Sequence, residues 1–256
     1  MQSTPAPKPW REIVVIRYLL LGVLSSVVIS AQADWTGIGE AGLLMSDGNT
    51  ETESANAKLK FSTEVSDWKH SLGLEGLYAS NEGDKTAQRW QLFGQSDYNI
   101  SEKTFAFGAG RYERDKFSGF KYQATLSSGL GRKLIRTDQT KLTATAGVGY
   151  KFFETRDTFD DLGALLEEGD TDNEAIFRGT ADFEHAFNES TSVINNFIVE
   201  AGSNNTYLEN GLALKVKMNA KLALALGYTV RHNTDPPSSF KSTDTMTTVN
   251  LVYEFK

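Results

Sequence analysis

The chain has 256 residues, a net charge of −7 at pH 7 and a mean hydropathy of −0.36. A nucleic-acid partner is not expected, because phosphate binding needs a basic surface. There is no cysteine, which excludes disulfides, thiolate metal sites and cysteine nucleophiles.

The N-terminus has the pattern of an export signal. Basic residues come first (Lys8, Arg11 and Arg17), residues 18–29 are almost all apolar, and residues 31–33 (AQA) suit a signal peptidase. The apolar run is shorter than the roughly 20 residues that a helix needs to cross a bilayer. We therefore expect cleavage after this segment, with an uncleaved anchor as the alternative.

Removal of residues 1–33 leaves a single mature domain, residues 34–256. The removed segment carries three basic and one acidic residue, so the net charge falls from −7 to −9. No apolar stretch of the mature domain reaches the length of a membrane-spanning helix. A membrane protein of such polar composition has to be a β-barrel, whose strands alternate lipid-facing and lumen-facing residues.

Twelve strands are expected along the mature domain. Merging or splitting a weak segment would give ten or fourteen. The expected ranges are 35–45, 53–65, 68–79, 87–99, 104–114, 120–134, 140–155, 174–187, 191–202, 206–218, 221–232 and 244–255.

The alternation is clearest in the C-terminal third. Leu222, Leu224 and Leu226 share one face of their strand, and Ala223 and Ala225 share the other. This period of two fits lipid outside and a polar lumen inside. The sequence therefore predicts an all-β, antiparallel, up-and-down transmembrane barrel, with a soluble β-sandwich as the alternative.

Short and long connections alternate between the expected strands. Short turns of outer-membrane barrels face the periplasm and long loops face outwards, which places both termini in the periplasm. The short connections are 66–67, 101–103, 136–139, 188–190 and 219–220; the others, mostly longer, are 46–52, 80–86, 115–119, 156–173, 203–205 and 233–243.

Aromatic residues are expected to form a girdle at each membrane interface. The predicted periplasmic girdle contains Trp35, Trp68, Tyr98, Tyr253 and Phe255, and the predicted outer girdle contains Tyr78, Tyr150, Phe152, Tyr207 and Tyr228.

Three segments carry a resemblance to a known family. Residues 110–122 read GRYERDKFSGFKY, residues 128–132 read SGLGR, and residues 46–52 read SDGNTET. With these motifs the mature chain resembles the salt-induced outer membrane proteins, a domain of unknown function. The resemblance implies a barrel in a Gram-negative outer membrane, and it implies no catalytic or binding residue.

No catalytic residue, cofactor or metal ligand set is predicted. A lipid-facing hydrolase site needs a histidine and a serine two positions apart on one strand. His70, His185 and His232 are followed at that spacing by Leu72, Phe187 and Thr234. We therefore expect no enzyme, and an outer-membrane hydrolase is the weakest alternative.

The connection at 156–173 is rich in carboxylates, which are ligands for Ca²⁺ or Mg²⁺ and contacts for cation-bridged lipopolysaccharide. A solvated acidic loop without a bound ion is the alternative. A short helical turn is expected at 162–166. The candidate cation contacts are Asp160, Asp161, Glu167, Glu168, Asp170, Asp172 and Glu174.

Charged residues of both signs are expected to point into the lumen from the last five strands. They either line a water-filled path or pair into a closed network. The first outcome predicts a passive or gated pore for small solutes or ions, linked to osmotic stress through the family name alone. The second predicts a non-conducting envelope barrel that acts through its acidic outer loops. The candidates are Arg178, Asp182, Glu184, Glu200, Lys215, Lys217, Arg231 and Glu254.

The last strand is expected to act as an assembly signal. Leu251, Tyr253 and Phe255 alternate on one face, and barrel-insertion machinery prefers such a strand, although Lys256 follows the terminal aromatic residue. The expected partners are this machinery, outer-membrane lipids and lipopolysaccharide. The expected state is an exported monomer in the outer membrane of a Gram-negative bacterium.

Overall fold

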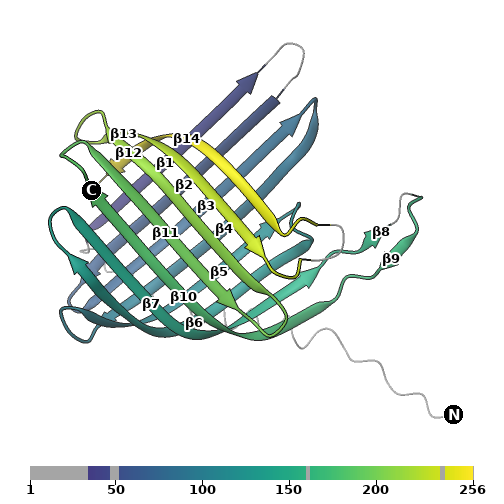
Figure 1. Cartoon of the computed structure of the whole chain (residues 1–256), viewed down its shortest axis with the longest axis horizontal. Helices are drawn as coiled ribbons and strands as arrows, with labels where there is room; N and C mark the ends of the chain where they lie inside the picture. Colours follow the sequence, from purple (N-terminus) through teal and green to yellow (C-terminus); the bar gives the residue numbers. More distant parts are fainter. Residues whose placement is uncertain (1–33, 47–51, 160–161, 237–239, 256) are drawn as a thin grey trace. The chain divides into compact units, whose positions relative to one another are not determined.

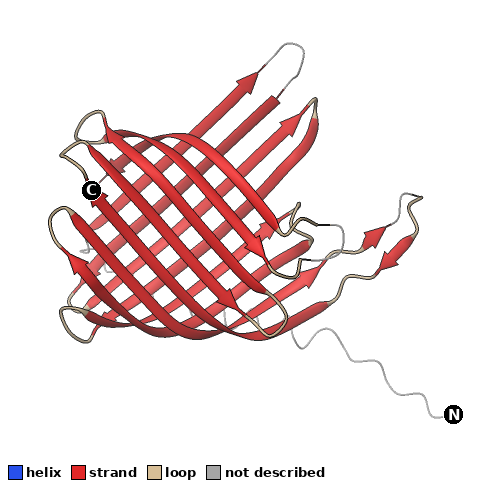
Figure 2. Ribbon diagram, viewed as in Figure 1, coloured by secondary structure: helices blue, strands red, loops and turns tan. Residues whose placement is uncertain are grey.

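The computed structural model describes residues 34–46, 52–159, 162–236 and 240–255. The predicted export signal lies outside the described residues and stays a prediction. The described part consists of strands and their connections (Figure 2). It contains no helix that could cross a membrane.

Twelve strands form one closed antiparallel barrel, in the order β1-β14-β13-β12-β11-β10-β7-β6-β5-β4-β3-β2 (Figure 1). The predicted fold and strand number are confirmed. The barrel strands are β1 (Trp35–Ser46), β2 (Thr52–Val65), β3 (Trp68–Asn81), β4 (Asp84–Asn99), β5 (Thr104–Asp115), β6 (Phe120–Arg136), β7 (Thr140–Thr155), β10 (Thr171–Ala186), β11 (Thr191–Ala201), β12 (Thr206–Lys217), β13 (Leu222–Asn233) and β14 (Thr243–Phe255).

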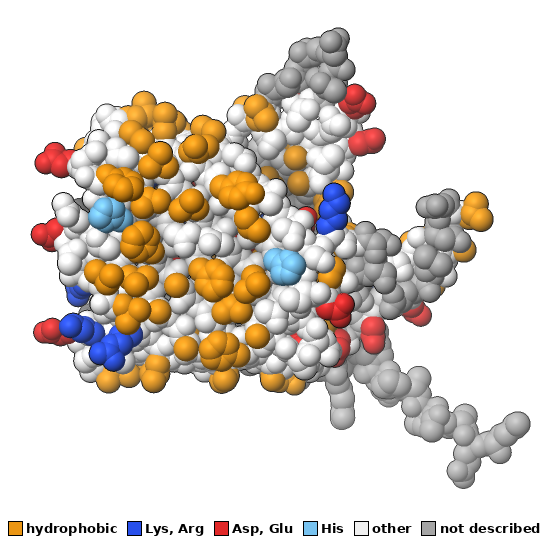
Figure 3. Space-filling model, viewed as in Figure 1, with side chains coloured by type: hydrophobic (Ala, Val, Ile, Leu, Met, Phe, Trp, Pro, Cys, Tyr) orange, Lys and Arg blue, Asp and Glu red, His pale blue; other side chains and the backbone are white. Residues whose placement is uncertain are grey.

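Alternation along each strand separates an apolar outer surface from the lumen. On β13, Leu224 and Leu226 are 46% and 53% exposed on the outside, whereas Ala223 and Ala225 are buried on the inside. Apolar side chains cover the outer face between charged groups at its two ends (Figure 3). This surface suits the hydrocarbon layer of a membrane.

The seam between β1 and β14 is the shortest junction of the barrel. It consists of five residue pairs, from Gly37↔Phe255 to Ala41↔Leu251. On its other side, β1 pairs with β2 over its whole length. Residues 243–250 of β14 consequently pair with β13 alone among the described residues.

A side-chain contact crosses β1 where the seam ends. The Asn56 amide donates a 2.9 Å hydrogen bond to the Asn250 side-chain oxygen. Gly42 of β1 lies between them, and a Cβ atom at this position would collide with both asparagine side chains. The contact therefore requires glycine.

Two connections at the outer rim differ from the sequence-based expectation. Residues 80–86 do not form a long loop, because β3 and β4 extend to a two-residue turn at Glu82 and Gly83. Both have positive φ angles, 52° and 82°, as a type I′ hairpin turn requires. The helical turn expected at 162–166 is also wrong. There, β9 (Leu165–Glu167) pairs with β8 (Thr158–Phe159).

The aromatic end of β14 lies against the start of the barrel. The Phe255 ring covers the backbone of Gly37, and it contacts Phe61 edge-on with a centroid distance of 5.6 Å. The ring therefore joins the last strand to β1 and β2.

Replacement of Gly42 by alanine is predicted to weaken the seam, because it separates Asn56 from Asn250. Loss of this hydrogen bond lowers the free energy of unfolding by about 1 kcal/mol. Gly76→Ala is the matched control, since a Cβ atom there meets no atom within 4 Å. Urea unfolding of both refolded variants measures the difference, and equal stability of the two would contradict the role of Gly42.

The predicted assembly role of β14 is tested with Phe255→Ser. Loss of the ring that joins the last strand to the first two is expected to lower the amount of folded protein in the outer membrane several-fold. Phe177→Ser is the control, because Phe177 is an outward phenylalanine of β10 that is 51% exposed. Immunoblots of outer-membrane fractions give the readout; unchanged levels for Phe255→Ser would refute the role.

Candidate functional site: a charged network across the lumen

Inward side chains from eight of the twelve barrel strands form a connected polar network. We call it the lumen network. Most of its members lie near the strand ends at the outer rim, which carries the long connections. The members are Lys58, Glu75, Arg89, Gln91, Arg111, Glu113, Arg178, Glu200, Tyr207, Glu209 and Arg231.

Arg111 is the centre of the lumen network. Its guanidinium lies 3.3 Å from the Glu113 carboxylate of the same strand and 2.6 Å from the Glu200 carboxylate of β11. Three strands separate β5 from β11 around the wall. The contact between Arg111 and Glu200 therefore crosses the lumen.

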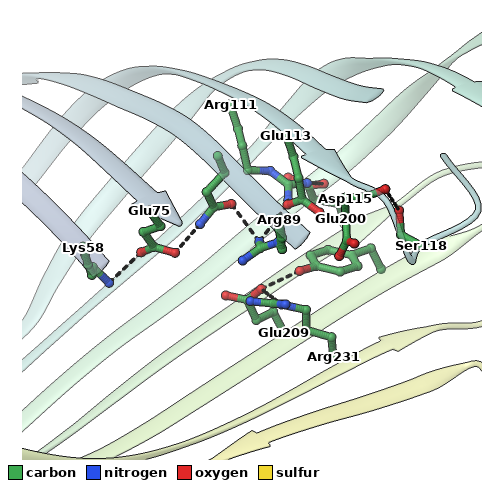
Figure 4. A network of polar contacts seen from close by, with 12 residues as sticks. Lys58, Glu75, Arg89, Arg111, Glu113, Asp115, Ser118, Glu200, Glu209 and Arg231 are labelled. Carbon is green, nitrogen blue, oxygen red and sulfur yellow. Dashed lines mark hydrogen bonds and ion pairs between the residues drawn. The ribbon is translucent and has the colours of Figure 1, made fainter. Parts of the chain in front are cut away.

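The two ends of the network continue along opposite walls. On one wall, Arg89 contacts Glu113 at 2.7 Å, and Gln91 and Glu75 extend the chain of contacts to Lys58. Figure 4 shows Arg89, Arg111 and Glu113 approaching from this wall, and Glu209 and Arg231 from the opposite one.

Tyr207 connects Arg111 to the opposite wall. The Arg111 guanidinium lies 5.1 Å from the centre of the Tyr207 ring, and the Tyr207 hydroxyl donates a 2.5 Å hydrogen bond to Glu209. Tyr207 is buried inside the barrel, so its predicted place in the outer aromatic girdle is wrong. Glu209 in turn pairs with Arg231 at 2.8 Å.

The central charges are shielded from solvent. The side chains of Arg89, Glu113 and Glu200 are 5%, 7% and 1% exposed. Buried charges are tolerated only when they are paired, because removal of one partner leaves the other without compensation. The network therefore consists of side chains that extend into the lumen and hold one another in place.

Three of the ion pairs that involve lumen candidates lie entirely within the last five strands. Arg178 lies 3.7 Å from Glu200, and Arg231 lies 2.8 Å from Glu209. Closer to the rim with the short turns, Lys215 contacts Glu254 at 2.9 Å.

The remaining lumen candidates lie apart from the network. Asp182 accepts a 2.7 Å hydrogen bond from Asn196, and Glu184 lies 3.4 Å from Lys141. Lys217 is exposed at the periplasmic end of β12.

Sequence reasoning missed the part of the network that comes from the earlier strands, and it also missed Glu209 of β12. Arg89, Arg111 and Glu113 occupy alternate positions on the lumen faces of β4 and β5. The same alternation that identified the later candidates could have found them. It could not have shown that Arg111 reaches β11, because this contact depends on the diameter and strand stagger of the closed barrel.

The outer acidic segment is divided between a loop and a strand. Glu168 and Asp170 are exposed in the connection, and Asp172 is exposed at the start of β10. Asp160, Asp161 and the side chain of Glu167 lie outside the described residues.

Glu174 was grouped with the candidate cation contacts of the acidic connection, although it is also the first residue of the expected strand 174–187. It belongs to β10 and is 7% exposed. Its carboxylate lies 3.4 Å from the Ser203 hydroxyl and from the Asn204 backbone nitrogen, at the β11–β12 connection.

Each histidine contacts a hydroxyl group on the adjacent strand. The Nδ1 atom of His70 lies 2.9 Å from the Ser96 hydroxyl. The Nδ1 atom of His185 lies 2.8 Å from the Thr140 hydroxyl. The Nδ1 atom of His232 lies 2.8 Å from the Thr243 hydroxyl. The repetition of one contact on different strand pairs favours a structural role.

Comparison with known families identifies the chain. The profile of the family described as "Protein of unknown function, DUF481" matches residues 39–255. The chain belongs to this family. A relative, "Uncharacterized protein YdiY" of Escherichia coli strain K12, is 24% identical over 233 residues, which cover 88% of this chain and 84% of the relative.

Solved structures of outer-membrane proteins share the fold. The translocator domain of the autotransporter NalP from Neisseria meningitidis aligns with a TM-score of 0.54 and 11% identity over 94% of this chain and 96% of its own. The COG4313 outer membrane channel from Pseudomonas putida F1 aligns with a TM-score of 0.50 and 10% identity over 87% of this chain and 95% of its own. The protein thus has an outer-membrane barrel fold.

The coupling between Arg111 and Glu200 is measurable. Arg111→Met and Glu200→Gln are each predicted to lower the free energy of unfolding by about 3 kcal/mol, because each removes the closest partner of a shielded charge. The double variant is expected to lose less than the sum, by about 1 kcal/mol or more.

Lys141 and Glu184 provide the matched control, since their side chains are 63% and 40% exposed. A pair this exposed is expected to show a coupling of at most about 1 kcal/mol. Urea unfolding of the refolded barrels, followed by tryptophan fluorescence, measures both cycles. Additive effects of Arg111→Met and Glu200→Gln would contradict a coupled pair.

Proposed function

We propose that this protein is a gated outer-membrane pore for small polar solutes or ions, and that the lumen network is its gate. Arg111 holds the closed state through Glu200 and Tyr207. Release of Arg111 separates the two walls of the network and opens a path. The lumen-facing charges of both signs then line this path and give weak charge selectivity.

The contact between Arg111 and Glu200 is the observation that carries this proposal. It closes the lumen with side chains that rotate about single bonds, whereas the backbone of the barrel wall stays fixed. An ion pair can exchange its partner for water or for another charge. A constriction of this type is therefore reversible, and the channel from Pseudomonas putida is a precedent for conduction by this fold.

The cellular setting completes the proposal. The protein is exported, is assembled by the barrel-insertion machinery and works as a monomer among outer-membrane lipids and lipopolysaccharide. Its resemblance to the salt-induced family adds a role during osmotic stress. A deletion strain then grows more slowly at high osmolarity, and growth equal to the parent strain would refute this role.

A barrel that never conducts is the second candidate. The burial of Arg89, Glu113 and Glu200 favours it, because a network this well shielded also serves as a permanent closure. Such a protein would act through its outer loops, whose exposed carboxylates include Glu168, Asp170 and Asp172.

Single-channel recording in a planar bilayer separates the two candidates. The refolded wild-type protein is expected to open briefly, and Arg111→Ala is expected to open about tenfold more often. A loss of 1.4 kcal/mol from the closed state is sufficient for this change. Arg136→Ala is the control, because Arg136 is exposed at the periplasmic end of β6.

A non-conducting barrel and a pore without this gate predict different single-channel recordings. Folded wild-type and Arg111→Ala proteins that are both silent would establish the non-conducting barrel. Equal conduction by both would retain the pore and reject the lumen network as its gate.

A further inference from the structure

A partly enclosed pocket of about 280 Å³ lies at the outer end of the lumen. Its lining comes from β2, β3, β4, β13 and β14, from the end of β5 and from the β5–β6 connection. Two network residues, Arg89 and Arg231, are part of the lining. The pocket is therefore in direct contact with the proposed gate.

The charged side chains of the pocket are two arginines and two aspartates. Arg89 is the register partner of Asp115, and Arg231 is the register partner of Asp244. All four line the pocket. Their formal charges sum to zero, so the pocket as a whole favours neither a simple anion nor a simple cation.

Both arginines line the pocket, and Arg89 has a donor that no acceptor of the described residues satisfies. Arg89 uses Nη2 for Glu113 and Gln91, and its Nε atom is buried without a hydrogen-bond acceptor among the described residues. A buried donor without an acceptor costs free energy. A ligand carboxylate that reaches Arg89 from the pocket would satisfy it.

The aspartates retain acceptor capacity. One oxygen of Asp115 accepts the backbone N–H of Phe117 at 2.8 Å. Neither Asp115 nor Asp244 forms an ion pair with a lysine or arginine of the described part of the chain, although each faces an arginine in register. An ammonium group is the complementary ligand for these two carboxylates.

The rest of the lining combines apolar side chains with four hydroxyl side chains, those of Ser54, Thr86, Thr229 and Thr245. Leu77, Phe117 and Met246 contribute to the pocket wall. The volume lies just below the range of roughly 300–1,000 Å³ for drug-sized ligands, so the ligand has to be small. One apolar side chain of a small molecule fits this part of the pocket.

We propose that this pocket binds a small zwitterion with an apolar side chain, of the chemical class of a large apolar α-amino acid. The ligand carboxylate binds Arg89 and Arg231, its ammonium group binds Asp115 and Asp244, and its side chain packs on Leu77, Phe117 and Met246.

Binding is expected to loosen the lumen network. The ligand carboxylate competes with Glu113 for Arg89 and with Glu209 for Arg231, and these contacts belong to the network. The ligand therefore favours the open gate. This second step rests on the proposed function, whereas binding itself does not.

Three compounds of nearly equal size test the binding step by calorimetry on the refolded full-length mature chain. L-phenylalanine carries both charges, 3-phenylpropionate lacks the ammonium group, and phenethylamine lacks the carboxylate. L-phenylalanine is expected to bind saturably, and each analogue about tenfold more weakly, because each loses one charge-assisted contact. Equal binding of either analogue would overturn the zwitterion, and no saturable binding by a folded barrel would overturn the site.

A variant locates the site. Asp244→Asn is expected to weaken L-phenylalanine binding about tenfold and to leave 3-phenylpropionate unaffected or improved, because it removes only the carboxylate that repels an anion. Asp84→Asn is the control, since Asp84 is exposed on the same rim outside the pocket. Equal loss in both variants, or none in Asp244→Asn, would place binding elsewhere.

Bilayer recordings with L-phenylalanine added on the side of the long loops test separately whether binding opens the gate. An increase in open probability supports it. Saturable binding with unchanged current would reject the coupling and retain the site. Conduction without saturable binding would reject the site and retain the pore.

Discussion

The hydrocarbon layer of the membrane offers no hydrogen-bond partner to a peptide group, and this determines the architecture of the protein. Every strand that crosses the layer needs a neighbour on both sides, so the sheet has to close. Closure assigns each residue to the lipid or to the lumen. Apolar and small or polar residues alternate along β13 and β14 because successive residues face the lipid and the lumen in turn.

The same constraint explains the lumen network. Charged side chains are excluded from the lipid face at membrane depth, so the strands direct them inwards, where they face one another across a narrow space. The network contains five basic and four acidic side chains and is therefore nearly neutral. Because the network is nearly neutral, its side chains can be buried without a large unpaired charge.

Much of the fold was predictable because its determinants are local. Alternation and turn residues identified twelve strands, whose ends differ from the structure by three residues or fewer. The errors arose where a local pattern has two interpretations. Residues 80–86 are polar, like a loop, but they continue a hairpin beyond the barrel, and Glu174 belongs to an acidic run but lies inside a strand. Tyr207 was assigned to the wrong face because tyrosine suits both an interface and a buried hydrogen bond. The ion pair between Arg111 and Glu200 was not predictable, because a contact across the lumen produces no periodic pattern in the sequence.

The short seam between β1 and β14 has a consequence for the order of assembly. The hairpins form between neighbouring parts of the chain, whereas the seam joins its two ends and costs the most loop-closure entropy. It also gains the fewest backbone hydrogen bonds in return. The seam is therefore the last junction to form as the barrel folds and the first to separate under mechanical load.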